Sequence, residues 1–503
     1  MVIKNKKTGG EEVIWRVKKG EIQPFLDWNN ISPGGVIFKK RGESYFPETH
    51  GIPVGIQFVS QEAMKSGFWL KADRPWEELA LGGYTTVIYE NGKYRLWYES
   101  CARDQKSDFD SKLCYAESND GYNWNKPDLN LIEFRGRKKN NIVYDKTVKG
   151  GYGYHGGTVF VDPVASPAER YKIMYLGGHY PEKFGPDWLE TIHMRGAVSS
   201  DGIHWRPLKN NLLDNYCSDT QTTTYYNTKS NSYVAYLRGG SDYYGRRRAI
   251  MRSETIDFQK WPRPECVLSL GANYHPSHDL YTNAHVIYPG RDDLHLMFPA
   301  QYNREIDTLE VYLATSSDGI RWEYFGENPV IPLSKGEGSI YAGCGVVPLK
   351  ENEAAVPYCV YPFTHNFPVS LYTSGAPSSN PIEAQKGYAG RYGWAIWKRD
   401  RFVAVEAKTK GEFFLFPMLI PQNGSLLLNA RVEKWGGMGI QIEDTEGRPI
   451  KNYRFSECDP ISGDFFDKPV TWKGKRVMPA AINKELRIHV KLQSAKIYAF
   501  KIA

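Results

Sequence analysis

Three acidic side chains occupy corresponding places in the chain: Asp219, Asp279 and Glu337 each stand at the start of a segment typical of a β-strand. Carboxylates that share one pocket push their pKa values apart, so that one acts as an acid and another as a base. Hydrolysis of a glycosidic bond needs such a pair, about 5–5.5 Å apart for retention of configuration and about 6.5–9.5 Å apart for inversion. We therefore predict Glu337 as general acid and Asp279 as base or nucleophile, with Asp219 tuning their pKa values or binding a hydroxyl group.

Further polar and aromatic side chains are predicted to surround the same pocket and to bind its substrate. Gln221 and Tyr281 lie two residues after Asp219 and Asp279, and residues two apart point to the same side of a strand. His155 opens another strand and is followed by two glycines, which permit close approach of the backbone. The ends of the second strands, which return to the same edge of each hairpin, supply the remaining candidates. The predicted substrate-binding residues are Glu99, His155, Gln221, Arg238, Tyr281 and Arg304.

A structural role is the alternative for each of these residues. An acid at a strand start often caps a turn, and a histidine such as His155 often links neighbouring polar groups. Arg238 and Arg304 are equally suited to salt bridges at the rim of the fold. Asp162, in a Phe-Val-Asp-Pro stretch, is assigned to a turn, because Asp-Pro commonly initiates one.

A repeated sequence box predicts the elements that position these residues. Ser-x-Asp-Gly-x-x-Trp occurs at residues 118–124, 199–205 and 316–322, with a degraded copy at 252–261. Repeats spaced by tens of residues indicate a repeat architecture. Strand-like segments precede each box in the same order, and a fifth set, ending with residues 388–397, follows the last box. Five repeated hairpin meanders are typical of an all-β fold, a five-bladed β-propeller in which the inner strands start at an axial pocket.

The boxes also divide the chain into parts. Residues 76–400 are predicted to form the propeller, which would be the catalytic domain. Residues 401–503 lack boxes and alternate short strands with turns, which is typical of an appended β-sandwich. Residues 1–75 are less regular, and we expect an N-terminal extension that packs on the propeller.

The composition argues against several partners. The 503 residues are 14% aromatic and include 47 Gly and 30 Pro, which favours short strands and tight turns over helices. Sixty-four basic and 57 acidic residues give a net charge of +7, and the basic run at 246–248 is too short for a nucleic-acid-binding arm. No apolar stretch approaches the roughly 20 residues that span a bilayer. We expect neither a nucleic-acid nor a membrane partner, and the sequence does not indicate an oligomeric state.

Motifs for metal and cofactor binding are missing from the sequence. The seven cysteines are scattered without a CxxC spacing, so neither a zinc site nor a disulfide framework is indicated. Dinucleotide, nucleotide-phosphate, zinc-protease and nucleophile-elbow motifs are absent, and we expect no cofactor and no metal. The basic N-terminus has no apolar segment. We expect a cytoplasmic protein, or a periplasmic or secreted one if a leader has been removed.

The boxes and the order of five units resemble the propeller superfamily of glycoside hydrolase families 32, 43 and 68. Residues 83–87 (GYTTV), 218–221 (SDTQ) and 279–281 (DLY) are similar to a bacterial group usually labelled glycoside-hydrolase-family-32-like. Residues 457–461 (ECDPI) and 471–474 (TWKG) resemble the sandwich domain of that group. The resemblance implies a five-bladed propeller with a C-terminal sandwich and activity on carbohydrate.

One departure from those families concerns the reaction. Families 32 and 43 carry an aspartate at the start of the first blade, where this chain has Gly83 and Tyr84, and residues 28–30 (WNN) lack the acid of the invertase motif. The nucleophile or base therefore does not carry over, and cleavage of sucrose or inulin is not expected. The candidate acids lie instead in the third to fifth units.

Together these patterns predict a glycoside hydrolase that cleaves a terminal sugar from an oligo- or polysaccharide. One alternative is a glycoside phosphorylase in which His155, Arg238 and Arg304 hold phosphate. The other is a non-catalytic propeller that binds glycans. Turnover that requires phosphate, or binding without turnover, would distinguish these alternatives.

Overall fold

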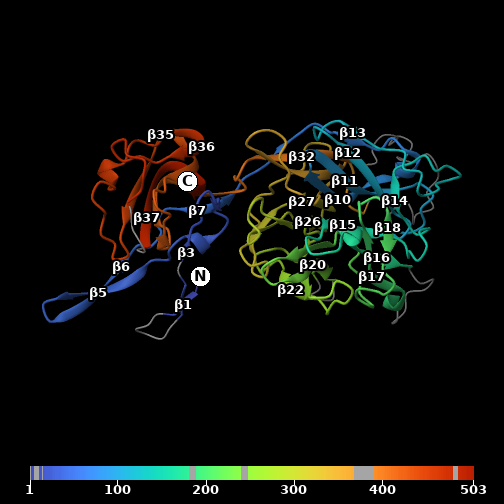
Figure 1. Cartoon of the computed structure of the whole chain (residues 1–503), viewed down its shortest axis with the longest axis horizontal. Coiled ribbons are helices and arrows are strands. Elements are labelled where there is room, and N and C mark those ends of the chain that lie inside the picture. The colour runs from blue at the N-terminus through green and yellow to red at the C-terminus, as the bar shows by residue number, and fades with distance from the viewer. Residues whose placement is uncertain are drawn as a thin grey trace. The chain divides into compact units, whose positions relative to one another are not determined.

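The computed structural model describes residues 2–4, 11–13, 15–179, 188–239, 247–366, 390–479 and 485–503. Arg246 and the first two residues of the predicted strand at 388–397 lie outside this set. The chain forms two compact units, Glu62–Arg399 and a second one composed of Met1–Gln61 with Asp400–Ala503 (Figure 1). Almost all regular structure in both is β-strand. No helix among the described residues is long and apolar enough to cross a membrane.

The first half of the Glu62–Arg399 unit consists of three antiparallel meanders, which Figure 1 colours from blue to yellow-green. In each, consecutive strands pair side by side. The first meander has the order β10 (Ala80–Glu90), β11 (Lys93–Cys101), β12 (Lys112–Ser118), β13 (Trp124–Asn125), and β14 (Ile142–Tyr144) also pairs with β12. The second has the order β15 (His155–Val161), β16 (Tyr171–Gly178), β17 (Ile192–Ser199), β18 (Trp205–Pro207). The third has the order β19 (Thr223–Asn227), β20 (Ser232–Gly239), β21 (Ala249–Thr255), β22 (Glu265–Leu268).

The second half of this unit contains a four-stranded and an eight-stranded sheet. The four-stranded sheet has the order β24 (Val286–Ile287), β25 (His295–Met297), β28 (Leu313–Ser316), β29 (Glu323–Phe325). The eight-stranded sheet has the order β23 (His278–Leu280), β26 (Ala300–Asn303), β27 (Thr308–Val311), β30 (Ser339–Ala342), β31 (Glu353–Tyr361), β32 (Arg391–Lys398), β8 (Met64–Lys65), with β9 (Leu70–Lys71) also on β32. One parallel pair, Leu309 with Ser339, joins its two halves.

Single backbone bridges connect these sheets in sequence. Gly157 pairs with Thr222 between the second and third meanders, and Thr86 of β10 pairs with Cys344 just after β30. Because the last sheet thereby contacts the first, the sheets of this unit have a propeller-like arrangement, as the box repeat predicts. Four separate four- or five-stranded sheets are present, while the predicted fifth blade is part of the eight-stranded sheet.

The boundary between the units differs from the predicted one at residue 75. β7 (Gln57–Ser60) pairs with β33 (Val403–Phe414), whereas β8 and β9 pair with β32. Residues up to Gln61 therefore belong with the C-terminal unit, and residues 62–71 supply the edge of the last propeller sheet. The sequence pattern did not reveal this boundary, because strands β8 and β9 have two residues each and are too short to show alternation.

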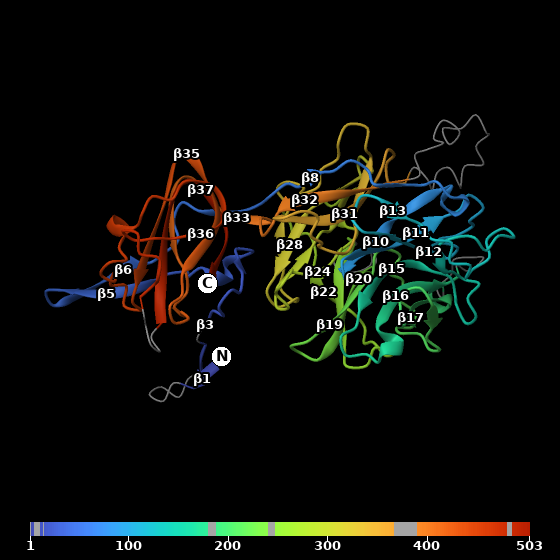
Figure 2. The same ribbon diagram turned by 45° about the horizontal axis from the view of Figure 1, so that its top comes forward.

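The unit formed by Met1–Gln61 and Asp400–Ala503 is built on long antiparallel strands (Figure 2). β37 (Glu485–Ile502) pairs with β33 on one side and with β35 (Leu426–Glu443) on the other. Shorter strands complete the sheets: β3 (Trp15–Arg16), β4 (Gln23–Pro24), β7, β34 (Met418–Leu419) and β36 (Gly463–Pro469). Separate hairpins are β1 (Val2–Lys4) with β2 (Glu11–Val13), and β5 (Gly35–Arg41) with β6 (Ser44–His50). A core that includes Phe25, Phe413, Trp472 and Ile488 stabilises the unit.

Each of the three complete boxes folds into the same hydrogen-bonded turn. The serine hydroxyl donates to the aspartate and accepts the glycine N–H, while the aspartate accepts two further backbone N–H groups. The glycine needs its left-handed conformation, with φ of 77° at Gly121, 76° at Gly202 and 70° at Gly319. In the first two boxes the tryptophan donates its indole N–H to the glycine carbonyl.

The glycine carbonyl of each complete box accepts a donor from a different sheet, in addition to the box tryptophan in the first two boxes. Trp97 Nε1 of β11 donates to Gly202 at 2.6 Å, and Trp394 Nε1 of β32 donates to Gly121 at 2.8 Å. In the third box the Tyr236 hydroxyl of β20 donates to Gly319 at 2.7 Å. Each complete box therefore fastens its own sheet to the preceding one.

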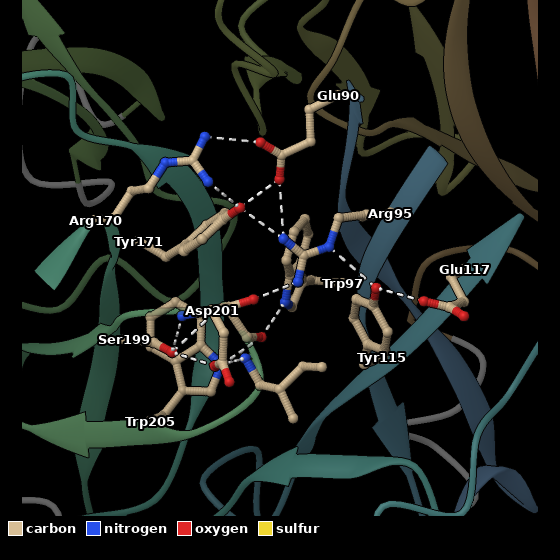
Figure 3. Close-up of polar contacts among 12 residues, drawn as sticks. Glu90, Arg95, Trp97, Tyr115, Glu117, Arg170, Tyr171, Ser199, Asp201 and Trp205 are labelled. Atoms are coloured by element: carbon tan, nitrogen blue, oxygen red, sulfur yellow. Dashed lines mark hydrogen bonds and ion pairs between the residues drawn. The ribbon is translucent and has the colours of Figure 1, made fainter. Parts of the chain in front are cut away.

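An ion-pair network reinforces this junction beside the second box (Figure 3). Arg95 of β11 donates to Glu90 at 2.9 Å and to Tyr115 Oη at 3.0 Å, and it also donates to the carbonyl of Asp201 in the box. Its guanidinium lies 4.8 Å from the ring centroid of Trp97 and 5.0 Å from that of Tyr171. The arginine thus has partners on both sheets.

The junction predicts a stability loss when one of the two donors is removed. Trp97→Phe keeps a buried aromatic ring but leaves the Gly202 carbonyl without its second donor. We expect the free energy of unfolding to fall by about 1–3 kcal/mol, measured by urea denaturation at neutral pH. Tyr89→Phe, at an exposed position of β10, is the matched control. A Trp97→Phe variant as stable as this control would contradict the role assigned to the junction.

A buried histidine pair predicts a loss of stability in acid. His285 Nε2 lies 3.1 Å from His295 Nδ1, and burial lowers the pKa of His295 to about 4 and that of His285 well below 6.5. As the pH falls from about 6.5 to about 4, the unfolded chain therefore takes up protons that the folded chain does not, and stability is lost. We expect His295→Asn to flatten this dependence in denaturation measured between these pH values. The exposed His275→Asn should keep the wild-type slope.

Candidate active site

A cluster of aromatic side chains lies where inner strands of the propeller unit meet. Tyr281 is at its centre, with ring centroids 6.0 Å from Tyr302, 6.4 Å from Tyr341 and 4.6 Å from His365. Tyr84 lies 6.1 Å from Tyr341 and 5.5 Å from His155. We call these six residues, Tyr84, His155, Tyr281, Tyr302, Tyr341 and His365, the central cluster. They come from β10, β15, β26, β30 and the segments after β23 and β31.

Asp219 is the predicted catalytic acid that borders this cluster. Its Oδ1 lies 2.6 Å from Arg238 Nη2, and the Arg238 guanidinium lies 4.7 Å from the Tyr281 ring centroid. The Arg238 side chain is buried, whereas that of Asp219 is 37% exposed. Burial alone would lower the pKa of Arg238, but the Asp219 carboxylate raises it. The site therefore presents an accessible carboxylate held by a buried cation.

Asp279 is placed differently, because two arginines surround it. Its Oδ1 accepts the backbone N–H of Arg248 at 2.9 Å, and its Oδ2 lies 2.8 Å from Arg248 Nη1 and 3.3 Å from Arg304 Nε. The carboxylate is 1% exposed. Arg304 also donates to the carbonyls of Pro276 and Ser277. This geometry favours a structural role for Asp279 and Arg304 over the predicted roles of base and substrate ligand.

Glu337 is not brought to the central cluster. Its Oε2 lies 2.6 Å from Lys65 Nζ of β8 and accepts the Ser334 N–H at 2.7 Å. No ion pair or hydrogen bond within the described part of the chain joins it to Asp219 or Asp279. The three predicted acids thus have separate cationic partners: Arg238 for Asp219, Arg248 and Arg304 for Asp279, and Lys65 for Glu337.

Glu99 and His155 form a buried ion pair at the edge of the cluster. Glu99 Oε1 lies 2.8 Å from His155 Nδ1, and Oε2 accepts the Gly156 N–H at 2.9 Å. Burial alone would lower the pKa of His155, but the charge and hydrogen bond of Glu99 raise it to about 9. His155 is therefore an imidazolium at neutral pH. Gly156 has φ of 70°, and a Cβ there would lie 2.1 Å from the Thr220 carbonyl oxygen, which confirms the close backbone approach expected at this glycine.

Gln221 lies beneath the cluster and does not border it. The side chain is fully buried, donates to the Ala342 carbonyl at 3.0 Å and accepts the Ala284 N–H at 2.7 Å. It links three segments of backbone. Of the nine predicted site residues, His155 and Tyr281 belong to the cluster, and Asp219 and Arg238 border it. Glu99 supports it, and Asp279 and Arg304 adjoin it through Arg248.

Sequence reasoning missed Arg248, Tyr341 and His365 as site residues. The Arg248 guanidinium lies 5.4 Å from the Tyr281 ring and 5.9 Å from the Tyr302 ring. It precedes β21 by one residue, and Gly239↔Ala249 pairing puts this strand start beside the end of β20 that carries Arg238. The sequence pattern considered the starts of first strands and the ends of second strands. Adding the starts of third strands, such as β21, would have identified Arg248. His365 Nδ1 lies 2.7 Å from Tyr341 Oη, and burial lowers the pKa of His365 to about 4, which keeps it neutral.

Metal-binding geometry is not present in the described residues. No group of three or more His, Cys, Asp or Glu side chains there is arranged to hold an ion. A hollow of about 500 Å³ does exist in the C-terminal unit, lined by residues that include Gly411, Gly437, Gly439 and Lys491. It contains none of the predicted site residues.

Comparisons with known proteins give distant structural similarity alone. No protein-family model and no curated protein matches the chain. Solved structures similar to it include an N-acetylgalactosamine deacetylase from F. plautii in complex with blood group B trisaccharide (TM-score 0.45, 15% identity, 70% of this chain and 96% of that one). Another is a glycosyl hydrolase from Bacteroides ovatus (TM-score 0.45, 13% identity, 69% of this chain and 95% of that one). A third is a fructofuranosidase from Schwanniomyces occidentalis complexed with fructosylnystose (TM-score 0.40, 10% identity, 86% of this chain and 99% of that one). Similarity at this level assigns neither a reaction nor a site residue.

Proposed function

We propose that the Glu62–Arg399 unit is a five-bladed propeller that hydrolyses the glycosidic bond of a terminal sugar at the central cluster. In this proposal β30, β31 and β32 form the fifth blade, and β8 and β9 supply its outer strand. The long strands of the other unit form a β-sandwich around their own core. The residue pairing described above supports both assignments.

The observation that carries the proposed reaction is a partly exposed carboxylate, Asp219, and an imidazolium, His155, at the same cluster of aromatic side chains. Tyrosine faces pack well against the apolar face of a sugar ring. Asp219 has one oxygen held by Arg238, while its partial exposure leaves it open to a water or a sugar carbon. The Asp219 charge also contributes to the raised pKa of His155, which places the two groups within electrostatic reach.

The two groups have complementary chemical roles. His155 carries a proton up to about pH 9 and would deliver it to the oxygen of the leaving group. Asp219 would either remove a proton from the attacking water or attack the anomeric carbon itself. Glu99 keeps His155 charged and oriented. These roles replace the sequence-based assignment of Glu337 as acid and Asp279 as base.

Substitution of the two candidate acids distinguishes these assignments. We expect Asp219→Asn to lower turnover by about 10²–10⁴-fold, and Glu337→Gln to retain it, because Glu337 is paired with Lys65. Turnover is measured by mass analysis of products from a panel of plant and marine glycans. Loss of turnover in Glu337→Gln with retention in Asp219→Asn would restore the original assignment.

The same panel separates hydrolysis from its alternatives. Products that contain a sugar phosphate, formed solely when inorganic phosphate is supplied, would identify a phosphorylase. Glycan binding without any product, unaffected by Asp219→Asn, would identify a binding protein. Either result would contradict the proposed hydrolysis.

The Glu99–His155 pair predicts a characteristic pH profile. If protonated His155 is the proton donor, wild-type kcat/KM falls as the pH rises through about 9. Glu99→Gln removes the charge that raises the pKa, so burial dominates and the alkaline limb moves to a lower pH. The profile of kcat/KM against pH measures this shift, with the exposed Glu78→Gln as control. An unmoved alkaline limb in Glu99→Gln would exclude His155 as the donor.

A further inference from the structure

We propose that the sugar bound at the central cluster carries an acidic substituent, a carboxylate or a sulfate ester, which Arg248 binds with the support of Arg238. This inference rests on the proposed function, because it concerns the substrate of the same site. The inference depends on where the two arginines lie, on their N–H donors and on how exposed the charged side chains are.

Both guanidinium groups contact one aromatic ring. Arg238 lies 4.7 Å and Arg248 5.4 Å from the ring centroid of Tyr281, and Arg248 also lies 5.9 Å from that of Tyr302. The strand pairing of β20 with β21 explains this, since both arginines lie at the same end of that pair. The cluster therefore combines aromatic rings with two permanent positive charges.

Arg238 has buried N–H groups without a hydrogen-bond partner among the described residues, and Arg248 has one nitrogen held by Asp279. A guanidinium carries five N–H donors. Arg238 uses Nη2 for Asp219, and within the described residues its Nε and Nη1 have no hydrogen-bond partner. Arg248 directs Nη1 to Asp279. Planar groups of acceptor oxygens, such as carboxylate and sulfate, suit such donors because they accept two parallel hydrogen bonds.

Arg248 is more accessible than the carboxylate that neutralises it. The side chain of Arg248 is 28% exposed, whereas its partner Asp279 is 1% exposed. The order is the reverse for Arg238, which is 8% exposed beside an Asp219 that is 37% exposed. A ligand that enters the cluster therefore meets the guanidinium of Arg248 with its counter-ion beneath. Burial of Asp279 also keeps Arg248 in place when no ligand is bound.

Other carboxylates near the cluster set the orientation of the sugar. Asp307 accepts hydrogen bonds on both oxygens from Tyr302 and Asn366, and these neutral donors leave its negative charge on the Tyr302 side of the cluster. Asp219 is accessible, and Asp108 also acts on His155 through its charge. The acidic substituent is therefore placed beside Arg248 itself, and the scissile bond at the Asp219 and His155 side.

Matched pairs of glycans test this inference without any variant. Each acidic polysaccharide of the plant and marine panel is supplied in its native form and after reduction of its carboxyl groups to neutral sugars, which preserves the linkages. Sulfated members are supplied before and after chemical desulfation. We expect cleavage of native acidic glycans to exceed that of the neutralised forms by about 10- to 100-fold in kcat/KM, the size of a lost charge-assisted contact. The two kinds of pair distinguish carboxylate from sulfate.

A variant that removes the charge of Arg248 tests whether this residue binds the acidic substituent. Arg248→Gln should abolish most of the preference for the acidic member of each pair while changing cleavage of the neutral member much less. Arg321→Gln, at an exposed position in the third box, is the control. If Arg248→Gln does not fold, Arg248→Lys keeps the charge but not the paired donors and should reduce the preference in part.

The outcomes separate the two proposals. Cleavage that favours the neutral forms, or a preference that survives Arg248→Gln, overturns the inference and leaves hydrolysis in place. If no member of the panel is cleaved, binding of each pair is measured by affinity electrophoresis. Selective binding of the acidic forms then supports the inference and contradicts hydrolysis, and binding without selectivity contradicts both.

Discussion

The propeller unit depends on the glycine carbonyl of each complete box, which accepts a donor from another sheet. In each complete box the glycine carbonyl faces a neighbouring sheet, and an aromatic N–H or O–H from that sheet donates to it. In two of the boxes the tryptophan of the box donates to the same oxygen. A Cβ on Gly202 would lie 2.6 Å from Trp97, so the contact also requires glycine. The box turns thus hold neighbouring sheets together, alongside the apolar clusters that pack between them.

Fixing the sheets at the boxes leaves the centre free for polar residues. Apolar clusters pack between successive sheets, whereas charged residues occupy the central region in pairs. Buried carboxylates cost much free energy unless they are paired and hydrogen-bonded, and Asp279 and Glu99 each have such partners. The pairing keeps charged side chains in a place where a substrate can use them.

The sequence predicted the antiparallel meanders well, because the box is a local structure. Ser, Asp and Gly form the turn among themselves, and strand order follows from short connections. The site was harder to predict, since each carboxylate selects a partner from a different strand. Strand starts indicated Asp219 and Tyr281, which lie near one another through Arg238, but could not indicate that Arg248 and Arg304 enclose Asp279 or that Lys65 binds Glu337. A pattern that follows single strands carries no information on ion pairs between residues up to 272 positions apart.

The division of the chain has a consequence for synthesis and folding. Strands β4 and β7, from the first 61 residues, pair with β37 and β33, and β8 pairs with β32. The propeller unit is therefore inserted in sequence within the other unit, and both contain partners separated by more than 300 residues. Contacts of such long range slow folding. On a ribosome the early strands must remain unpaired until their partners emerge, which makes them the segments of the nascent chain with the greatest need for protection by chaperones.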